Sequence, residues 1–326
     1  MTPKELEFRP DLHAHVSAFG GRQALAPDVE RLRLPLANAF FLGEPGQPWV
    51  LLDAGAPGSG PVIARAAVAR YGAGARPEAI VLTHGHLDHI GGLWGLLKQW
   101  PDTPIYAHPL ELPYLTGQSA YPPPDPTVGG SMSALSPLFV PGPFDFRPHV
   151  RPLGELPELA ALKGWTFLDT PGHSPGHVSL WRKADRLLIA GDAFVTTVQE
   201  RVTGALTLRP QLVHRPPAYY TPDWDQARAS VERLAALEPA LAVTGHGDPL
   251  AGKKVQDELR RLAQNFDELA RPKQGRYIVQ PAVTGASGVV SLPPLSRRGQ
   301  MLRAGLLVGA GLLVVRQLRY WGVLGK

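Results

Sequence analysis

The sequence predicts an α+β fold in which several strands end at one edge of a sheet core. Short apolar runs, typical of buried strands, alternate with longer segments whose apolar residues recur at helical spacing. Glycine and proline turns separate these segments. Four of the apolar runs are followed by a glycine turn that carries a histidine or an aspartate. With 326 residues and 44% hydrophobic side chains, the chain is long enough for a sizeable core in one or two domains.

The first half of the chain alternates strands with helices. A helix is predicted over 61–71, where apolar residues follow a proline in the first turn, and another over the residues after Gly92, ending before Pro101. The strands expected around these helices cover residues 12–20, 32–42, 49–52, 79–82 and 104–107.

The second half repeats this alternation. Asp223 is placed to cap a helix over 223–237, and an apolar stripe predicts a last helix over 253–269. The strands expected in this half cover residues 165–168, 178–181, 186–190 and 241–243.

Composition narrows the class of protein. The chain has no cysteine, which excludes disulfides, a thiolate nucleophile and a sulfur-ligated metal. Nine of its 33 basic side chains and none of its 28 acidic ones follow residue 270, so the preceding residues carry a net charge of −4. This acidic body argues against a nucleic-acid partner. The first 19 residues lack a basic region followed by an apolar run, so we expect no secretory signal peptide and a cytoplasmic location.

The stretch from Thr83 to Gly92 has the composition of a metal site. It places His84, His86, Asp88 and His89 within six positions, directly after the apolar run 79–82. Imidazole nitrogen and carboxylate oxygen are the ligands that a borderline divalent cation such as zinc prefers. A polar loop with hydrogen-bonded histidines is the plainer interpretation. Four ligand-type side chains beside glycines favour the metal site.

Three later segments have the same layout, and each offers one ligand at the end of an apolar run: His173, Asp192 and His246. Together with the first four, they make seven ligands. That number exceeds the needs of one tetrahedral ion and suits two ions that share a carboxylate. We therefore expect two divalent metal ions, with zinc the first choice and iron or manganese as alternatives.

The combination of THGHLDH, PGHSPGH, GD and TGHG at these intervals resembles the metallo-β-lactamase superfamily over roughly residues 10–270. The resemblance implies a four-layer αββα sandwich with a dinuclear site along one edge, formed by residues 1–270. It also implies that His84, His86 and His173 hold one ion. Asp88, His89 and His246 would hold the other, with Asp192 as the bridge. In such a site the metals activate a bridging water, and Asp88 and Asp192 are the catalytic residues.

Other polar residues near these motifs have weaker indications. His177 is expected to orient a ligand by a hydrogen bond, and Asp53 to do the same or only to cap a turn. His13 and His15 are expected to be surface or packing residues. Three further histidines could approach the site from loops, although nothing in the sequence places them there: His108, His149 and His214.

The ligand set leaves the substrate open because enzymes with unrelated substrates share it. The expected activity is hydrolysis of a small ester, thioester or lactone with apolar character. The first alternative is a persulfide dioxygenase with a single iron, held by His84, His86 and Asp192 or a similar subset. The second is a phosphodiesterase or nuclease of the same fold. A non-catalytic, membrane-attached binding protein would have no use for the intact ligand set.

Residues 111–157 contain eleven prolines, so little regular structure is expected there. Their aromatic side chains favour a cap that packs over the site, and a free linker is the alternative. The aromatic run 217–224 could form a wall of the pocket or serve only in packing.

The end of the chain is expected to form a linker over 271–300 and a tail over 301–326. The tail contains twelve consecutive apolar residues, 304–315, between Arg303 and Arg316. As a helix they reach about 18 Å, less than the roughly 30 Å hydrocarbon core of a bilayer. Basic flanks fit a helix at an anionic membrane surface, which would attach the protein to the inner face of the membrane. The alternative is packing on the body or across a dimer contact.

Overall fold

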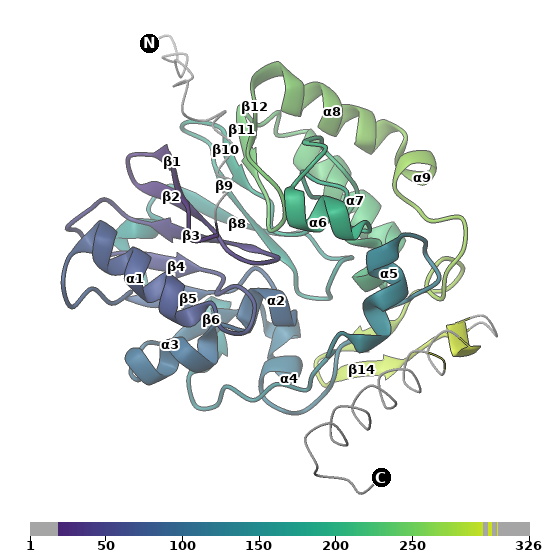
Figure 1. Ribbon diagram of the computed structural model, residues 1–326, viewed down its shortest axis with the longest axis horizontal. Helices are drawn as coiled ribbons and strands as arrows, with labels where there is room; N and C mark the ends of the chain where they lie inside the picture. Colours follow the sequence, from purple (N-terminus) through teal and green to yellow (C-terminus); the bar gives the residue numbers. More distant parts are fainter. Residues whose placement is uncertain (1–18, 296–298, 302–304, 306–326) are drawn as a thin grey trace, which may run out of the picture.

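The protein, described here by a computed structural model over residues 19–295, 299–301 and 305, is built from two β-sheets that pack face to face. Helices cover both outer faces of this pair, so the layers run helix, sheet, sheet, helix (Figure 1). The predicted α+β fold, a four-layer αββα sandwich, is confirmed.

The first sheet has seven strands in chain order, β1 to β7. Neighbouring strands are antiparallel from β1 to β4 and parallel from β4 to β7. The strands are β1 (Arg22–Ala26), β2 (Val29–Arg33), β3 (Asn38–Leu42), β4 (Val50–Leu52), β5 (Ala79–Val81), β6 (Ile105–Ala107) and β7 (Val150–Pro152).

The second sheet has five strands in the order β12, β11, β10, β9, β8. Only the β10–β11 pair is parallel. The strands are β8 (Trp165–Asp169), β9 (Val178–Arg182), β10 (Leu187–Ile189), β11 (Leu241–Val243) and β12 (Leu250–Ala251). A separate hairpin follows, made of β13 (Val283–Gly285) and β14 (Gly288–Ser291).

The helices vary from single turns to more than three turns. The α-helices are α1 (Gly60–Tyr71), α2 (Leu87–Ile90), α3 (Leu93–Gln99), α4 (Leu112–Leu115), α5 (Ser131–Leu135), α6 (Val202–Thr207), α7 (Trp224–Ala235), α8 (Gly252–Gln264) and α9 (Phe266–Leu269). The 3₁₀ turns are η2 (Pro109–Glu111), η3 (Ser136–Leu138), η4 (Leu153–Glu155), η5 (Ala160–Leu162) and η6 (Ala218–Tyr220).

Alternation along the strands produces the layers. In β3, Phe40 and Leu42 point into the core between the sheets, while Phe41 points outward to the core beneath α1 and α3. In β10, Leu188 likewise points outward, toward α7 and α8, and Ile189 points inward. Successive side chains on a strand face opposite ways, so strands that are apolar throughout can serve an inner and an outer core at once.

The predicted helices are present, with one correction. Asp223 caps α7 as expected, since its side chain accepts hydrogen bonds from the backbone N–H groups of Asp225 and Gln226. The single helix predicted over 253–269 is instead two helices, α8 and α9. The chain leaves helical geometry at Asn265, where φ is −123° and ψ is 35°.

The strand predicted over 32–42 was also wrong in its extent. The chain turns between β2 and β3, with Leu36 at a positive φ of 70°. Strand β1 and most of β2 were not predicted, and the strand predicted over 12–20 falls mostly outside the described residues; Phe19 and Gly20 lie in a turn or bend.

The proline-rich segment 111–157 contains only short helices and the edge strand β7. The residues that follow α9, for which the sequence suggests a linker, lie against this segment. The Tyr277 hydroxyl donates a hydrogen bond to the carbonyl oxygen of Pro123 at 2.7 Å, and the Val289 N–H donates to Ser119 Oγ at 3.1 Å.

The apolar tail predicted over 301–326 lies outside the described residues, apart from residues 301 and 305. In the part of the chain that is described, no helix is both long enough and apolar enough to cross a bilayer.

Candidate metal centre

Loops at one edge of the two sheets bring the seven predicted residues together. His84 and His86 follow β5, and Asp88 and His89 lie in α2. The other three come from separate strand ends of the second sheet: His173 after β8, Asp192 after β10 and His246 after β11. The expected convergence of strand ends is present in the fold.

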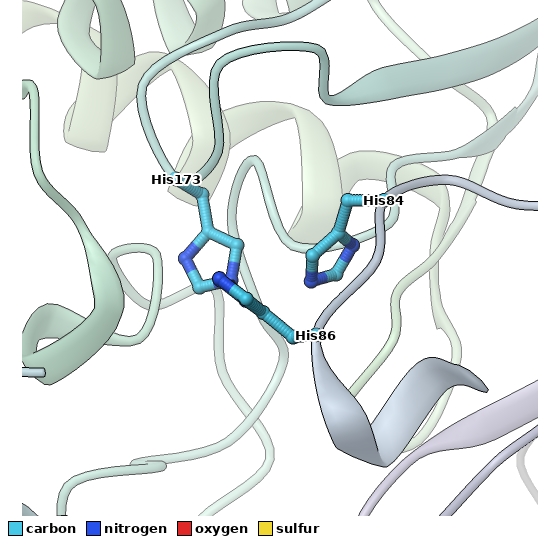
Figure 2. A group of neighbouring side chains, drawn as sticks. All are labelled: His84, His86 and His173. Carbon is cyan, nitrogen blue, oxygen red and sulfur yellow. The ribbon is translucent and has the colours of Figure 1, made fainter. Parts of the chain in front are cut away.

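Three imidazoles form the first group of candidate ligands, which we call the histidine triad: His84, His86 and His173. One ligand atom from each lies within 4.8 Å of the other two. His86 Nδ1 is 3.0 Å from His173 Nε2. Figure 2 shows the three rings turned toward a common point, with His84 and His86 on one segment of chain and His173 on a separate loop.

The second group, which we call the mixed triad, contains one carboxylate and two imidazoles: Asp88, His89 and His246. Asp192 lies between the two triads. Its Oδ2 atom is 2.9 Å from His246 Nε2, 3.6 Å from His89 Nε2 and 3.5 Å from His173 Nε2. A single carboxylate oxygen thus lies near histidines of both groups.

Several polar atoms at the centre are buried without a partner. His84 Nε2, His89 Nε2 and Asp192 Oδ1 are inaccessible and form no hydrogen bond with any described residue. An unsatisfied buried polar atom costs about 1–3 kcal/mol, so such a concentration needs a compensating ligand. Nitrogen and carboxylate donors at these separations fit divalent cations, and the residues present therefore suit the expected metal.

The pKa shifts in the histidine triad favour neutral imidazoles. Burial lowers the pKa of His84 and of His173 well below the usual value, and the neighbouring histidines lower both further. For His86, burial lowers the pKa to about 3. A neutral imidazole offers a lone pair to a metal without first losing a proton.

The mixed triad differs because carboxylates surround it. Burial alone would lower the pKa of His89, but Asp192 and Asp53 outweigh burial and raise that pKa well above its usual value. Burial would raise the pKa of Asp192, but the nearby His246 and His89 hold it well below the usual range. Positive charge is therefore favoured at this end of the site.

Asp53 contacts His89, as expected if it orients that side chain. Its Oδ2 atom is 2.9 Å from His89 Nδ1, and its carboxylate also accepts hydrogen bonds from the N–H and the hydroxyl of Thr83, both at 2.8 Å. Asp53 has a φ of 59°, a conformation that few residues other than glycine adopt. This backbone geometry places the carboxylate behind a candidate ligand.

The other candidate ligands are contacted by uncharged groups on the side away from the centre. His177 Nε2 accepts a hydrogen bond from the Asp192 N–H at 2.8 Å, in agreement with the orienting role expected for it. His246 Nδ1 is 2.6 Å from the Leu36 carbonyl oxygen, and His173 Nδ1 is 3.4 Å from Thr221 Oγ1. Leu36 and Thr221 carry no sequence signal for this role.

Gly245 is needed because the site is crowded. A Cβ atom at this position would lie 2.1 Å from Asp192 Oδ1 and 2.6 Å from His89 Cε1. The glycine before His246 therefore lets one ligand loop pass directly over two others.

The remaining predicted histidines lie away from the centre or outside the described residues. His214 pairs with Glu200 at 2.9 Å, and His108 Nδ1 accepts a hydrogen bond from the Leu110 N–H. The imidazole of His149 has no assigned role. His13 and His15 fall outside the described residues.

A cavity of about 730 Å³, including its part open to solvent, lies over the two triads. Its floor is formed by ligand residues from both triads together with Asp192. Its apolar wall contains Met132, Leu138, Phe139 and Val140 from the proline-rich segment, together with Pro217, Tyr219 and Tyr220. Among the described residues that line it, none is lysine or arginine.

Comparison with known proteins agrees with this geometry. Residues 33–246 match the model of the metallo-beta-lactamase superfamily. A probable metallo-hydrolase of Bacillus subtilis, YflN, is 43% identical over 75% of this chain and 93% of its own length. Another from the same organism, YybB, is 32% identical over 67% of this chain and 84% of its own. The crystal structure of a beta-lactamase domain protein from Burkholderia ambifaria has a TM-score of 0.52 and 22% identity, covers 78% of this chain and 79% of that chain, and shows the shared fold.

Proposed function

The chain belongs to the metallo-β-lactamase superfamily, and from that membership we propose that it is a metal-dependent hydrolase of a small ester, thioester or lactone with an apolar acyl part. The observation that carries the proposal is the cavity, in which an apolar wall faces the two triads. Apolar surface binds an acyl chain, while the ligand cluster lies where its carbonyl carbon would be held.

The wall of the cavity favours an acyl substrate over a phosphodiester. Proteins that bind phosphates present arginine, lysine or a series of backbone N–H groups to the phosphate oxygens. The described residues lining this cavity include no arginine or lysine, and the only carboxylates there are Asp88 and Asp192. A polyanionic substrate would gain little from such a wall, whereas an apolar chain would be desolvated by Phe139 and its neighbours.

We propose two divalent ions, zinc first and iron or manganese as alternatives. The histidine triad would hold one ion and the mixed triad the other, with Asp192 between them. When bound, the ions would activate a water molecule for attack and polarise the scissile carbonyl. The unpartnered atoms His84 Nε2, His89 Nε2 and Asp192 Oδ1 support this assignment.

Asp88 and Asp192 are the proposed catalytic residues, and their surroundings suit different roles. The Asp192 side chain is 2% exposed and lies near histidines of both triads, so it would stay ionised and fix the spacing of the centre. The Asp88 side chain is 26% exposed, lines the cavity, and lies 3.5 Å from His246. It can therefore accept a proton from a substrate or solvent group and return it to a leaving group.

Metal analysis combined with a substrate panel tests this function. The purified protein should contain two divalent ions per chain. It should hydrolyse apolar esters, thioesters or lactones at least about tenfold faster, in kcat/KM, than phosphodiesters. Phe139→Ala should raise KM for long-chain substrates more than for acetyl analogues, because only the longer chains reach the apolar wall.

Two results would contradict the proposal. One is a single iron per chain with oxygen consumption on a persulfide, the outcome expected of a dioxygenase. The other is a preference for phosphodiesters in the same panel.

We further propose that the basic, apolar tail attaches the protein to the inner face of the membrane. The proposal is supported by the sequence of residues 303–326, which places twelve apolar residues between arginines and contains no acidic side chain. Deletion of residues 296–326 should move the protein from the membrane to the soluble fraction. An untagged full-length protein found wholly in the soluble fraction would refute attachment.

A further inference from the structure

Glu111 is a buried carboxylate that the metal ligands and the cavity leave without a role. It ends the short turn η2 in the proline-rich segment and is 0% exposed. No ion pair among the described residues includes it. A carboxylate removed from water without a cation costs several kcal/mol unless hydrogen bonds compensate.

Four donors surround this carboxylate, and they come from both sides of the histidine triad. Glu111 Oε2 accepts from the Gly85 N–H at 3.0 Å and from the Tyr121 hydroxyl. Glu111 Oε1 accepts from Ser174 Oγ at 2.8 Å and from the Gly176 N–H at 2.7 Å. One side chain thus hydrogen-bonds two loops that lie far apart in the sequence.

The donors to Glu111 lie beside residues of the histidine triad in the sequence. Gly85 lies between His84 and His86, and Ser174 directly follows His173. Gly85 also packs closely against Tyr121, since a Cβ atom there would lie 2.2 Å from the tyrosine hydroxyl oxygen. The two loops that carry the histidine triad are therefore joined through one carboxyl group.

The mixed triad is held by different groups. Asp53 contacts His89, and the Leu36 carbonyl contacts His246. In the described part of the chain, Glu111 forms hydrogen bonds with Gly85, Tyr121, Ser174 and Gly176, and none with Asp88, His89 or His246. A change at Glu111 should therefore act on one triad and leave the other in place.

We propose that Glu111 is a positioning residue for the histidine triad. It sets the distance between the His84–His86 loop and the His173 loop, and through that distance the affinity of this triad for its ion. The inference rests on the two-ion site of the proposed function. It goes beyond that function because it makes the metal affinity of the histidine triad depend on a residue that is not itself a candidate ligand.

The test is Glu111→Gln, with zinc affinities measured by competition with a chromophoric chelator. Glutamine has the same shape as glutamate, but an NH₂ group replaces one of the two carboxylate oxygens. The two donors that faced that oxygen lose their acceptor, so one of the two loops is released. Affinity for one of the two zinc ions should fall about 10- to 100-fold, with the other unchanged. Glu200→Gln is the matched control, because Glu200 is also a buried carboxylate, accepts hydrogen bonds from His214, Arg215 and Ala218, and contacts neither loop. It should leave both affinities unchanged.

Paired variants identify the triad that is affected. In a His246→Ala background, which keeps the histidine triad, Glu111→Gln should weaken the remaining ion by the same factor. In a His173→Ala background it should have no effect on the remaining ion. Equal weakening in both backgrounds, or none in either, would overturn the inference.

A milder variant covers the case in which Glu111→Gln does not fold. Ser174→Ala removes one donor and leaves three, and it should weaken the same ion by about threefold with a native melting profile. Unchanged zinc affinity in that variant would count against the proposed positioning role of Glu111. If the wild-type protein binds two zinc ions but cleaves no substrate, the proposed hydrolase fails while the role of Glu111 stands. If it binds no zinc, iron or manganese, both fail.

Discussion

The two halves of the molecule supply the candidate site in different ways. The first half contributes four ligand-type residues from one stretch of six positions, His84 to His89. The second half contributes His173, Asp192 and His246 from three loops that follow three different strands. Local sequence places the first set, whereas only the assembled second sheet can place the other.

The difference extends to the groups that hold each set. In the first half, a buried carboxylate, Asp53, contacts His89 at 2.9 Å. In the second half, the Nδ1 atom of His173 contacts a hydroxyl oxygen, Thr221 Oγ1, at 3.4 Å. The His246 loop depends on the first half, because Asn38 Nδ2 donates to the carbonyl oxygens of Thr244 and Gly247, both at 2.9 Å. We infer that the ligands of the second half are the more sensitive to loss of tertiary structure.

Asp192→Ala should have the largest effect, because it removes the second-half candidate ligand whose carboxylate lies near histidines of both triads. Turnover should fall at least about 1,000-fold, and the protein should lose more than one equivalent of metal. Kinetics and elemental analysis of the same preparation check this. Asp257→Ala, on the exposed surface of α8, should change neither. Full turnover by Asp192→Ala would refute the proposed site.

Two variants, Asp53→Asn and Thr221→Val, compare the carboxylate that contacts His89 with the hydroxyl that contacts His173. The amide would replace an acceptor of the His89 N–H with a group that can turn NH₂ toward it, and metal affinity should fall about 10- to 100-fold. Loss of the long Thr221 contact should cost less than about threefold. Zinc competition on both variants measures the ratio. If the two variants lost equal zinc affinity, the charge of the Asp53 carboxylate would contribute nothing to holding His89.

The lowered pKa of Glu200 predicts that the fold loses stability in acid. Burial would raise its pKa, but the hydrogen bond with His214 and the charge of Arg215 outweigh burial and lower the pKa of Glu200 to about 2. A carboxyl with a depressed pKa stabilises the fold fully above its unfolded value, about 4.5, and this stabilisation is lost as the pH falls toward 2.

The unfolding free energy should therefore drop by about 2–3 kcal/mol between pH 4.5 and pH 2 through this group. Urea unfolding of the wild type and of Glu200→Gln at several pH values tests the prediction. The variant should be less stable at neutral pH and should show a shallower decline in acid. Parallel curves for the two proteins would exclude Glu200 as the source.

Asp223→Ala should give the smallest effect. It removes the side-chain cap that accepts from the Asp225 and Gln226 N–H groups, and α7 packs on the second sheet. The expected cost is about 1 kcal/mol, or about 2 °C in Tm, with metal content unchanged. Calorimetry measures it. A fall in zinc content at the same time would mean that α7 supports the ligand loops more directly than its contacts suggest.

The sequence could predict the features of the fold and site that depend on residues close together in the chain. Each of the four motifs that carry the candidate ligands lies after an apolar run and contains a glycine, so its position at a strand end could be predicted from local pattern. The cap at Asp223 and the strand β11 are equally local. The mixed fold could be inferred from such segments before any contact between the sheets was known.

The remaining features depend on contacts between distant residues. Glu111 is separated from Gly85 by 26 positions and from Gly176 by 65, and no residue beside it suggests those partners. The turn at Leu36 and the break at Asn265 interrupt apolar patterns that run straight through them. A periodic pattern records which face is buried, and it does not record where the backbone bends.

The contacts between the residues after α9 and the proline-rich segment bear on how the protein is made. Asp125 accepts a hydrogen bond from the Arg276 N–H, Pro123 from Tyr277, and Ser119 from Val289, across 151, 154 and 170 positions of sequence. Such distant contacts form late in folding, because closing a long loop precedes any gain from them. On the ribosome, these three hydrogen bonds cannot all form until residue 289 has emerged. A chain that ended before residue 276 would therefore contain every strand of the two packed sheets, the last of which ends at Ala251, but would lack these three bonds.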